Sequence, residues 1–463
     1  MSASKIFKSL FKKQRLTQVF IDHIAGSAAV GLDRVRPLHF QKNMTAEVIG
    51  ICERVAAGTY KFTSFKQKLI SKGANSYPRV ISIPTVRDRI TLRTLCEFLS
   101  LLYFDLKIEI PQIKIASLKS ILLTNTHNSF IKIDLSSFYT SIEQDILIKI
   151  LKRKIRKPEI LSLIKAAIQT PTIADGKATK NLNLEGVPQG LAISNILAEI
   201  FISDFDSIML SIPNIYYQRY VDDILILCDR ANSDDIADLA FLELTKLKLK
   251  PHSIGKVDSK SIKGDLTASF DYLGYTIEPK NNILKLIESK IGVRNTTIRR
   301  FEATIAKIFT TYRYQLTHAE TSDQKTRAER ICEWRLNLRI TGCIFEKRRL
   351  GWIFYFSQVN TSTPLRAIDS TVESLMRRFS LVGKIKVKSL VKAFYETQRR
   401  NKINHKYIPN FDHMSVEEKR LILTRFLVSS EIAHYSDERI NSLFKMRIGA
   451  VVKELEKDIQ GFS

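Results

Sequence analysis

The clearest pattern in this chain is an apolar and aromatic run at residues 216–228 that is interrupted by two adjacent aspartates, Asp222 and Asp223. The residues before the pair are mainly aromatic and those after it are mainly aliphatic, which favours two short buried strands. The pattern therefore predicts a β-hairpin with an acidic tip. As an alternative, the two aspartates form a solvated turn between two ordinary strands.

A third aspartate closes another short β-like run, at residues 131–134. A strand ending at Asp134 beside the hairpin would bring three carboxylates together. Carboxylates are not readily buried without a cation, and Mg²⁺ is a hard ion that takes oxygen ligands. A cluster of this kind can hold two ions about 3.5 to 4 Å apart, which clamp the attacking and leaving oxygens in phosphoryl transfer. We therefore predict a magnesium site here, with Mn²⁺ as an alternative ion.

Two further segments suit a nucleotide-binding groove. Residues 186–195 form a Gly- and Pro-containing loop that opens an apolar helix expected at 196–202, and such a loop lets the backbone approach a base or sugar closely. Upstream, residues 80–83 alternate as in a strand, Pro84 ends it, and Asp88 stands near the start of a helix expected at 90–102. A basic residue on that strand, facing the acidic cluster, would meet a triphosphate.

The C-terminal part has a different pattern. From about residue 284 the strand signal fades, and helical periodicity predicts helices at 296–316, 327–338, 367–379, 387–400, 415–430 and 442–459. Residues 377–402 hold nine basic residues and one acidic residue, interleaved with aromatic side chains. This mixture suits the backbone and bases of a nucleic acid. A solvated basic helix remains the alternative.

Composition points the same way. The chain of 463 residues has a formal net charge of +26, of which +12 lies in residues 1–285 and +14 in residues 286–463. So strong a bias favours a polyanionic partner for both parts, although a basic surface can also serve solubility. The five scattered cysteines form no zinc or disulfide pattern and suit a reducing cytoplasm, and no run of 18 apolar residues predicts a membrane span.

Taken together, residues 134–139, the Pro188-Gln189-Gly190 loop and the hairpin at 220–223 resemble the palm motifs of reverse transcriptases. Residues 79–89 resemble the fingers of the bacterial members of that family. The Ile-Pro-Thr fingers segment, Val221 in the hairpin and the long helical C-terminal region are most similar to the abortive-infection, or defence-associated, reverse transcriptases. Group II intron and retron enzymes are more distant relatives.

The resemblance implies an α/β right-hand polymerase with fingers and palm in residues 1–285, followed by an α-helical thumb and C-terminal region in residues 286–463. It implies RNA-directed DNA synthesis by two-metal nucleotidyl transfer in the cytoplasm, acting in antiphage defence. Its partners would be an RNA template, a DNA product and dNTPs, with no membrane; a homo-oligomer and a protein encoded nearby both stay open. A group II intron or retron enzyme and a catalytically idle RNA-binding scaffold are the alternatives.

The resemblance also implies roles for individual residues. The catalytic set is Asp134, Asp222 and Asp223, which together with Leu135 would hold the metal ions. The nucleotide-binding set is Arg79, Tyr139, Gln189, Gly190 and Lys256. The primer- and template-binding set is Arg87, Arg89, Tyr220, Tyr272 and Gly274. Solvated surface charges are the alternative for the two arginines, and simple packing is the alternative for the tyrosines.

Overall fold

The computed structural model of this chain describes residues 2–71, 77–106, 109–177, 179, 181–256, 259–279, 289–399, 407–427 and 432–456. The chain forms two compact units, residues 1–109 with 129–264 and residues 110–128 with 265–463. This division differs from the one predicted at residue 285. Residues 110–128, which lie in the middle of the first part of the sequence, belong to the unit that contains the C-terminal helices.

The first unit contains most of the strands. Its elements are α1 (Ala3–Leu10), α2 (Lys13–His23), α3 (Pro37–Lys42), α4 (Met44–Ala56), β1 (Phe65–Ile70), β2 (Arg79–Ile83), α5 (Val86–Leu102), β3 (Ser129–Asp134), α7 (Phe138–Ser141), α8 (Gln144–Lys152), α9 (Pro158–Gln169), β4 (Thr172–Ile173), α10 (Ser194–Ser211), β5 (Tyr216–Tyr220), β6 (Asp223–Cys228), the 3₁₀ turn Arg230–Asn232, α11 (Ser233–Lys246) and β7 (Ile262–Asp265).

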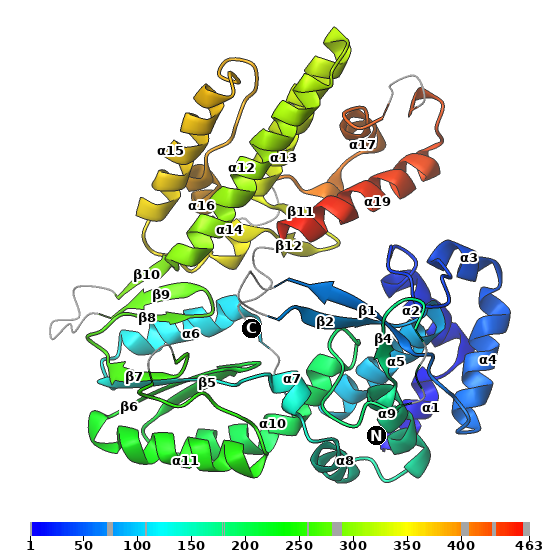
Figure 1. The fold of residues 1–463 in the computed structure, drawn as a ribbon, viewed down its shortest axis with the longest axis vertical. Helices are drawn as coiled ribbons and strands as arrows, with labels where there is room; N and C mark the ends of the chain where they lie inside the picture. The colour runs from blue at the N-terminus through cyan, green and yellow to red at the C-terminus, as the bar shows by residue number, and fades with distance from the viewer. Residues whose placement is uncertain are drawn as a thin grey trace. The chain divides into compact units, whose positions relative to one another are not determined.

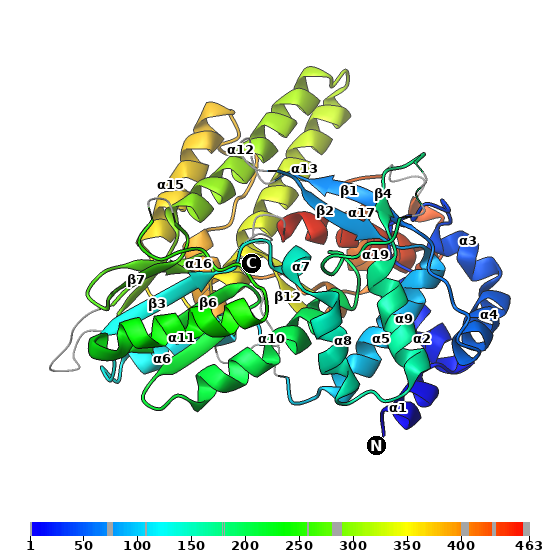
Figure 2. The same ribbon diagram turned by 60° about the horizontal axis from the view of Figure 1, so that its bottom comes forward.

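A four-stranded sheet of order β5-β6-β3-β7 forms the floor of this unit. Strand β6 pairs antiparallel with both β5 and β3, and all of its residues are buried. Helices α10 and α11 run along one face of the sheet (Figures 1 and 2). Because β6 is central and covered, its run of aliphatic residues contributes to one continuous core with α10, as the apolar pattern at 224–228 predicts.

The same unit contains a smaller sheet of order β2-β1-β4. Strand β2 and helix α5 confirm the strand and helix predicted around Pro84. The Thr85 side chain caps α5 by accepting the Asp88 N–H at 3.2 Å, and the buried Asp88 carboxylate in turn accepts the Tyr60 hydroxyl at 2.8 Å. A β-carbon at Gly31 would lie 2.8 Å from the Thr85 Cα, so the N-terminal segment packs closely on this turn.

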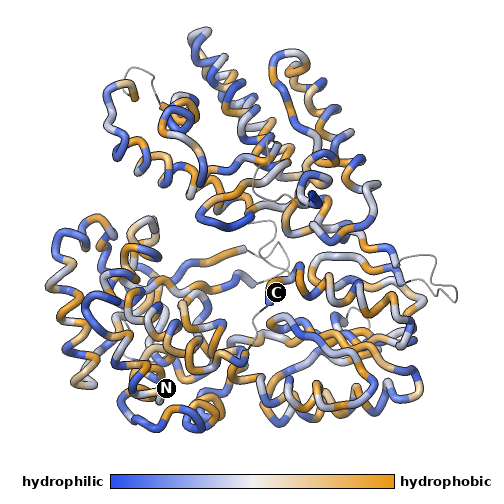
Figure 3. Tube along the Cα trace, turned by 180° about the vertical axis from the view of Figure 1, so that it is seen from behind, coloured by the Kyte–Doolittle hydropathy of each residue, from blue (hydrophilic) through white to orange (hydrophobic). Residues whose placement is uncertain are grey.

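The second unit is mainly helical. Its elements are α6 (Pro111–Leu122), β8 (Phe270–Tyr272), β9 (Tyr275–Glu278), β10 (Lys290–Val293), α12 (Asn295–Thr317), α13 (Ser322–Thr341), β11 (Cys343–Phe345), β12 (Arg348–Leu350), α14 (Trp352–Tyr355), α15 (Thr363–Arg378), α16 (Leu390–Gln398), the 3₁₀ turn Phe411–His413, α17 (Val416–Leu423) and α19 (Asp437–Leu455). Hydrophobic and hydrophilic stretches alternate along its helices, as they do in the first unit (Figure 3).

The predicted C-terminal helices correspond to α12, α13, α15, α16, α17 and α19, while the predicted ends at residues 400, 430 and 459 lie outside the described residues. An entirely α-helical region is not what the structure shows. Strand β10 completes a sheet with β8 and β9, and β11 pairs with β12. These strands have only three or four residues, too few for a period of two to stand out in the sequence.

Among the described helices, none is long and apolar enough to cross a lipid bilayer. The five cysteines are all free thiols.

Candidate active site

The hairpin tip and the end of β3 meet in one place. In the sheet register Asp134 lies opposite Asp223, and Asp223 also lies opposite Tyr220 on the other side. The Leu135 N–H donates to the Asp222 carbonyl at 3.3 Å. The structure therefore brings together three acidic residues that are up to 89 positions apart in the sequence. The expected turn is shifted slightly, because Asp223 is already the first residue of β6.

The pKa values of both hairpin aspartates are raised. Burial, followed by the negative charges of Asp223 and Asp134, raises the pKa of Asp222 to about 7. Burial also raises the pKa of Asp223 to about 6, although the Lys132 ammonium 3.7 Å away opposes this shift. Within the described part of the chain, Oδ1 of each hairpin aspartate is buried without a hydrogen-bond partner. Asp222 Oδ1 is therefore available to a cation, and Asp223 Oδ1 already has the Lys132 ammonium 3.7 Å away.

Asp134 has two neighbours, a histidine and a lysine, that the sequence did not reveal. Its Oδ2 lies 3.3 Å from His252 Nε2 and 3.7 Å from Lys260 Nζ. His252 is brought there by the backbone, because its N–H donates to the Asp134 carbonyl at 3.0 Å and Pro251 pairs with Leu135. The segment 250–252 contains no recognisable motif, so only the folded chain identifies this contact.

The Gly/Pro loop at residues 186–195 contacts strand β2. The Ser82 N–H donates to the Gln189 carbonyl at 2.7 Å. Gly190 has φ +98°, and a β-carbon there would lie 2.7 Å from Ile81 Cγ2, so glycine is required for this approach. Arg79 begins β2, and its positive charge is close enough to lower the pKa of Asp222 somewhat. The loop thus connects the strand that carries Arg79 to the acidic cluster.

Tyr139 lies close enough to Asp222 to be affected by its charge. Its hydroxyl donates to Asn195 Oδ1 at 2.8 Å, at the start of α10, and its backbone carbonyl accepts the Val187 N–H. Burial and then the negative charge of Asp222 raise the pKa of Tyr139. The ring is therefore a neutral, half-buried aromatic surface beside the carboxylates.

Arg219, one residue before Tyr220, is a second feature that the sequence did not reveal. Its guanidinium is buried between two acidic residues of α10, Glu199 and Asp206, at distances down to 2.6 Å. It also donates to the Val221 carbonyl at 2.9 Å. The buried cation therefore lies next to the acidic tip of the hairpin and contacts its backbone.

The site suits a divalent cation by its chemistry. Its donors are oxygens, and two buried carboxylate oxygens have unused acceptor capacity. In the described ranges, however, no three His, Cys, Asp or Glu side chains are arranged to hold one ion among themselves. A complete ligand set would therefore include backbone or substrate oxygens, as expected for Leu135 and for the phosphates of a nucleotide.

Comparison with known proteins decides the fold family of this segment. The sequence profile described as "Reverse transcriptase (RNA-dependent DNA polymerase)" matches residues 70–277, which include all three aspartates, the Gly/Pro loop and the hairpin. Residues 70–277 are a reverse transcriptase domain. The fold is accordingly the mixed α/β fold of right-hand polymerases, and the domain is that of an RNA-directed DNA polymerase, a nucleotidyltransferase.

Individual relatives are distant. Protein YkfC of Escherichia coli (strain K12) is 26% identical over 196 residues, which are 39% of this chain and 50% of YkfC. The match therefore spans about half the length of that curated relative. Among solved structures, telomerase from Candida albicans in complex with the TWJ fragment of telomeric RNA gives a TM-score of 0.42 at 14% identity, covering 87% of this chain and 69% of that one. Apo telomerase from Candida tropicalis, truncated from the C-terminal domain, gives 0.40 at 17% identity, covering 50% and 55%.

For other predicted residues of the reverse transcriptase domain, the structure shows contacts other than with the three carboxylates. Arg89 is held by the N-terminal segment, donating to Ser27 Oγ and the Ala29 carbonyl, both at 2.9 Å. Arg87 donates to Thr63 Oγ1 at 3.4 Å. Lys256 is exposed and lies four residues before Lys260, which pairs with Asp134. The contacts of Arg89 favour a packing role, while template binding remains a prediction for both arginines.

Tyr272 and Gly274 belong to the second unit. They form the hairpin between β8 and β9, in which Leu273 and Gly274 both have positive φ, as expected for a tight two-residue turn. Tyr272 is fully buried. The bend predicted at Gly274 is confirmed, whereas primer binding by these residues stays a prediction.

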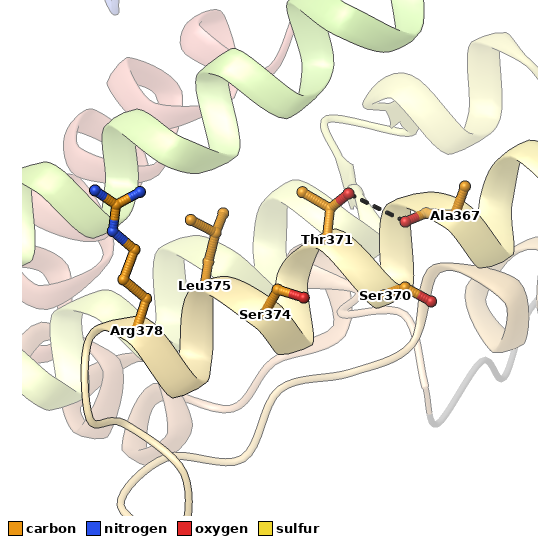
Figure 4. Close-up of a pocket in the computed structure, with 6 residues that line it drawn as sticks. All are labelled: Ala367, Ser370, Thr371, Ser374, Leu375 and Arg378. Atoms are coloured by element: carbon orange, nitrogen blue, oxygen red, sulfur yellow. Dashed lines mark hydrogen bonds between the residues drawn. The ribbon is translucent and has the colours of Figure 1, made fainter.

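The second unit also has a shallow pocket on α15, lined by Ala367, Ser370, Thr371, Ser374, Leu375 and Arg378 (Figure 4). The Thr371 hydroxyl there lies within hydrogen-bond distance of two acceptors, the Ala367 carbonyl at 3.1 Å and Glu302 Oε1 of α12 at 2.9 Å. None of the residues predicted for the site lines this pocket, and it is not the candidate active site.

Proposed function

We propose that this chain is an RNA-directed DNA polymerase that uses two divalent metal ions and acts in antiphage defence. The observation that supports it best is the sheet register, in which Asp134 lies opposite Asp223, while in the described part of the chain the buried Oδ1 atoms of Asp222 and Asp223 accept no hydrogen bond. A buried carboxylate is unfavourable unless a cation compensates its negative charge, and a divalent cation bound here would supply that charge.

In this proposal Asp134, Asp222 and the Leu135 carbonyl hold the ions, and Asp223 assists. When bound, the ions lower the pKa of the primer 3′-hydroxyl and neutralise charge on the α-phosphate and the departing pyrophosphate. The chain's own contribution is to orient the carboxylates through the β3–β6 register. The reaction transfers a deoxynucleotidyl group from a dNTP to the primer.

The nucleotide would lie between the loop and strand β2. Arg79 would bind its phosphates, and Gln189 and Gly190 would contact the nucleotide and template. The hydrogen bond from Ser82 to Gln189 supports this arrangement, because it ties the loop to the strand that carries Arg79. Tyr139 would stack beneath the sugar, where the bulk of its ring leaves no room for a 2′-hydroxyl.

The defence role and the cytoplasmic location are the finer parts of the proposal. They are supported by the sequence resemblance of residues 79–89, of the hairpin with Val221 and of the long helical C-terminal region to defence-associated reverse transcriptases. The net charge of +26 supports an RNA template and a DNA product as partners.

The first test is nucleotide incorporation. Purified full-length protein is assayed with labelled dNTPs and Mg²⁺, and the nucleic acid that copurifies with it is sequenced to identify template and product. We expect incorporation that is lost in the Asp222→Asn, Asp223→Asn double variant and retained in the Asp234→Asn, Asp235→Asn variant, which changes an exposed pair of neighbouring aspartates. Incorporation by the first variant at the wild-type rate would refute the catalytic assignment.

The second test is phage infection of cells that express either variant. Protection that needs Asp222 and Asp223 supports catalytic defence. Protection that survives their loss would instead identify an RNA-binding scaffold. An intron or retron RNA gene flanking the coding sequence would assign the chain to those enzymes.

A further inference from the structure

Arg219 is bound in a way that only a guanidinium allows. Its Nε and Nη2 grip the two oxygens of Asp206 at 2.8 and 2.6 Å, and Nη1 and Nη2 reach the two oxygens of Glu199 at 3.2 and 2.6 Å. The remaining Nη1 hydrogen goes to the Val221 carbonyl at 2.9 Å. The five N–H donors of the side chain therefore make five hydrogen bonds, and a lysine has only three donors on one atom.

The carbonyl that Arg219 binds belongs to a strained residue. Val221 has φ +55°, a left-handed conformation that β-branched residues rarely adopt. Such a conformation persists only where the surroundings fix it from more than one side. Here Arg219 fixes the Val221 carbonyl, and the Leu135 N–H fixes the next carbonyl, that of Asp222, at 3.3 Å. The two consecutive peptide groups that lead into Asp222 and Asp223 are thus both oriented.

The acidic partners keep the buried arginine charged. Burial alone would lower the pKa of Arg219, but the hydrogen bonds and charges of Asp206 and Glu199 outweigh it and raise that pKa. The Tyr217 hydroxyl donates to Asp206 Oδ1 at 2.5 Å and so helps to hold this acceptor. Glu199 and Asp206 are seven residues apart, two turns along one face of α10, and this spacing lets both reach one guanidinium.

We propose that Arg219 is a positioning residue for the metal-binding carboxylates, and that Glu199 and Asp206 orient it. Arg219 itself touches neither substrate nor metal. Its role is to hold the hairpin turn in the conformation that directs the Asp222 carboxylate toward Asp134. This inference rests on the proposed function, because it assumes that the carboxylates bind divalent ions.

The test uses full-length protein and Mn²⁺ alone, with free Mn²⁺ measured by electron paramagnetic resonance. Binding that disappears in the Asp222→Asn, Asp223→Asn variant defines the site. In Arg219→Lys, which keeps the charge but not the five donors, we expect this site to bind Mn²⁺ about 10- to 100-fold more weakly. The midpoint of thermal unfolding, measured with EDTA, checks that the variant is folded.

Arg153→Lys is the matched control. Arg153 also pairs with an aspartate of α10, Asp204, through two contacts of 2.8 and 2.9 Å, but this pair is exposed and is not part of the hairpin. We expect its Mn²⁺ affinity to equal that of the wild type. If Arg219→Lys does not fold, Glu199→Gln replaces it; that variant leaves the arginine bound to Asp206 and is expected to lose affinity in the same direction.

Wild-type Mn²⁺ affinity in the folded Arg219 variant, or in Glu199→Gln if that is the folded one, would overturn the inference and leave the proposed function intact. A wild-type protein without any Mn²⁺ binding that depends on Asp222 and Asp223 would overturn both. Equal losses in the Arg219 and Arg153 variants would also reject the positioning role, because the effect would then follow from any broken ion pair on α10.

Discussion

The paired carboxylates of Asp222 and Asp223 should make the metal-free protein less stable as the pH rises. Their pKa values of about 7 and about 6 lie above the usual 3.8, so the folded state retains protons that the unfolded state has already released. The stabilisation is therefore complete below about pH 4 and is lost as the pH rises through 6 and 7. Between about pH 5.5 and pH 8 the loss amounts to about 2 kcal/mol for Asp222 and about 1 kcal/mol for Asp223.

Thermal unfolding in EDTA measures this loss. At about 2–4 °C per kcal/mol, a change of about 3 kcal/mol lowers the unfolding midpoint by about 6–12 °C between the two pH values. The Asp222→Asn, Asp223→Asn variant lacks both titrating groups. Its unfolding midpoint should therefore not show this fall of about 6–12 °C between the two pH values, and it should exceed the wild-type midpoint at pH 8. Titration elsewhere in the chain is common to both proteins and cancels in the comparison.

A control variant and the addition of Mg²⁺ make the test selective. The Asp234→Asn, Asp235→Asn variant removes the same charge from an exposed pair and should follow the wild-type pH dependence. Mg²⁺ at pH 8 should raise the midpoint of the wild type and not that of the Asp222, Asp223 variant, because only a folded carboxylate pair binds the ion. Parallel pH dependence in the wild type and the Asp222, Asp223 variant would refute the reasoning, since the carboxylates would then be solvated.

Substitutions around the nucleotide position have distinct expected effects. Gly190→Ala places a β-carbon 2.7 Å from Ile81 Cγ2 and 3.0 Å from the Ser82 carbonyl, so we expect a loss of about 1–3 kcal/mol in unfolding free energy and reduced incorporation. Gly176→Ala, which also has positive φ but has open space around it, should keep wild-type incorporation. Tyr139→Val should raise ribonucleotide relative to deoxyribonucleotide incorporation in single-nucleotide extension, whereas Tyr139→Phe, which keeps the ring, should not.

The sequence predicted the elements of the site because each lies within a local pattern. Residues 216–228 are two apolar and aromatic segments, typical of buried strands, separated by two aspartates, which are typical of a turn. The structure has strands there on both sides of Asp222. The chain has a second Asp-Asp pair at 234–235, preceded by polar residues instead of a strand. That pair lies exposed in the first turn of α11. The flanking pattern, and not the dipeptide, distinguished a buried acidic tip from a solvated one.

What the sequence could not supply depends on contacts between distant segments. Glu199 and Asp206 are two acidic residues in an apolar helix, and nothing local identifies Arg219 as their common partner. The contacts of His252 and Lys260 with Asp134 depend on how residues 250–252 pair with the end of β3. Pairing of this kind follows from the three-dimensional register, to which local periodicity contributes no information.

The register also explains why the separation of the motifs in the sequence matters less than their alignment in the sheet. Side chains along a strand alternate between the two faces, so a slip of β3 by one residue would place Leu135 or Ile133 opposite Asp223 and turn Asp134 to the other face. The same slip would break the hydrogen bond from Leu135 to the Asp222 carbonyl and leave Arg219 as the remaining support of the strained turn. Loops between the motifs can therefore change length freely, whereas an insertion within β3 or β6 would separate the carboxylates.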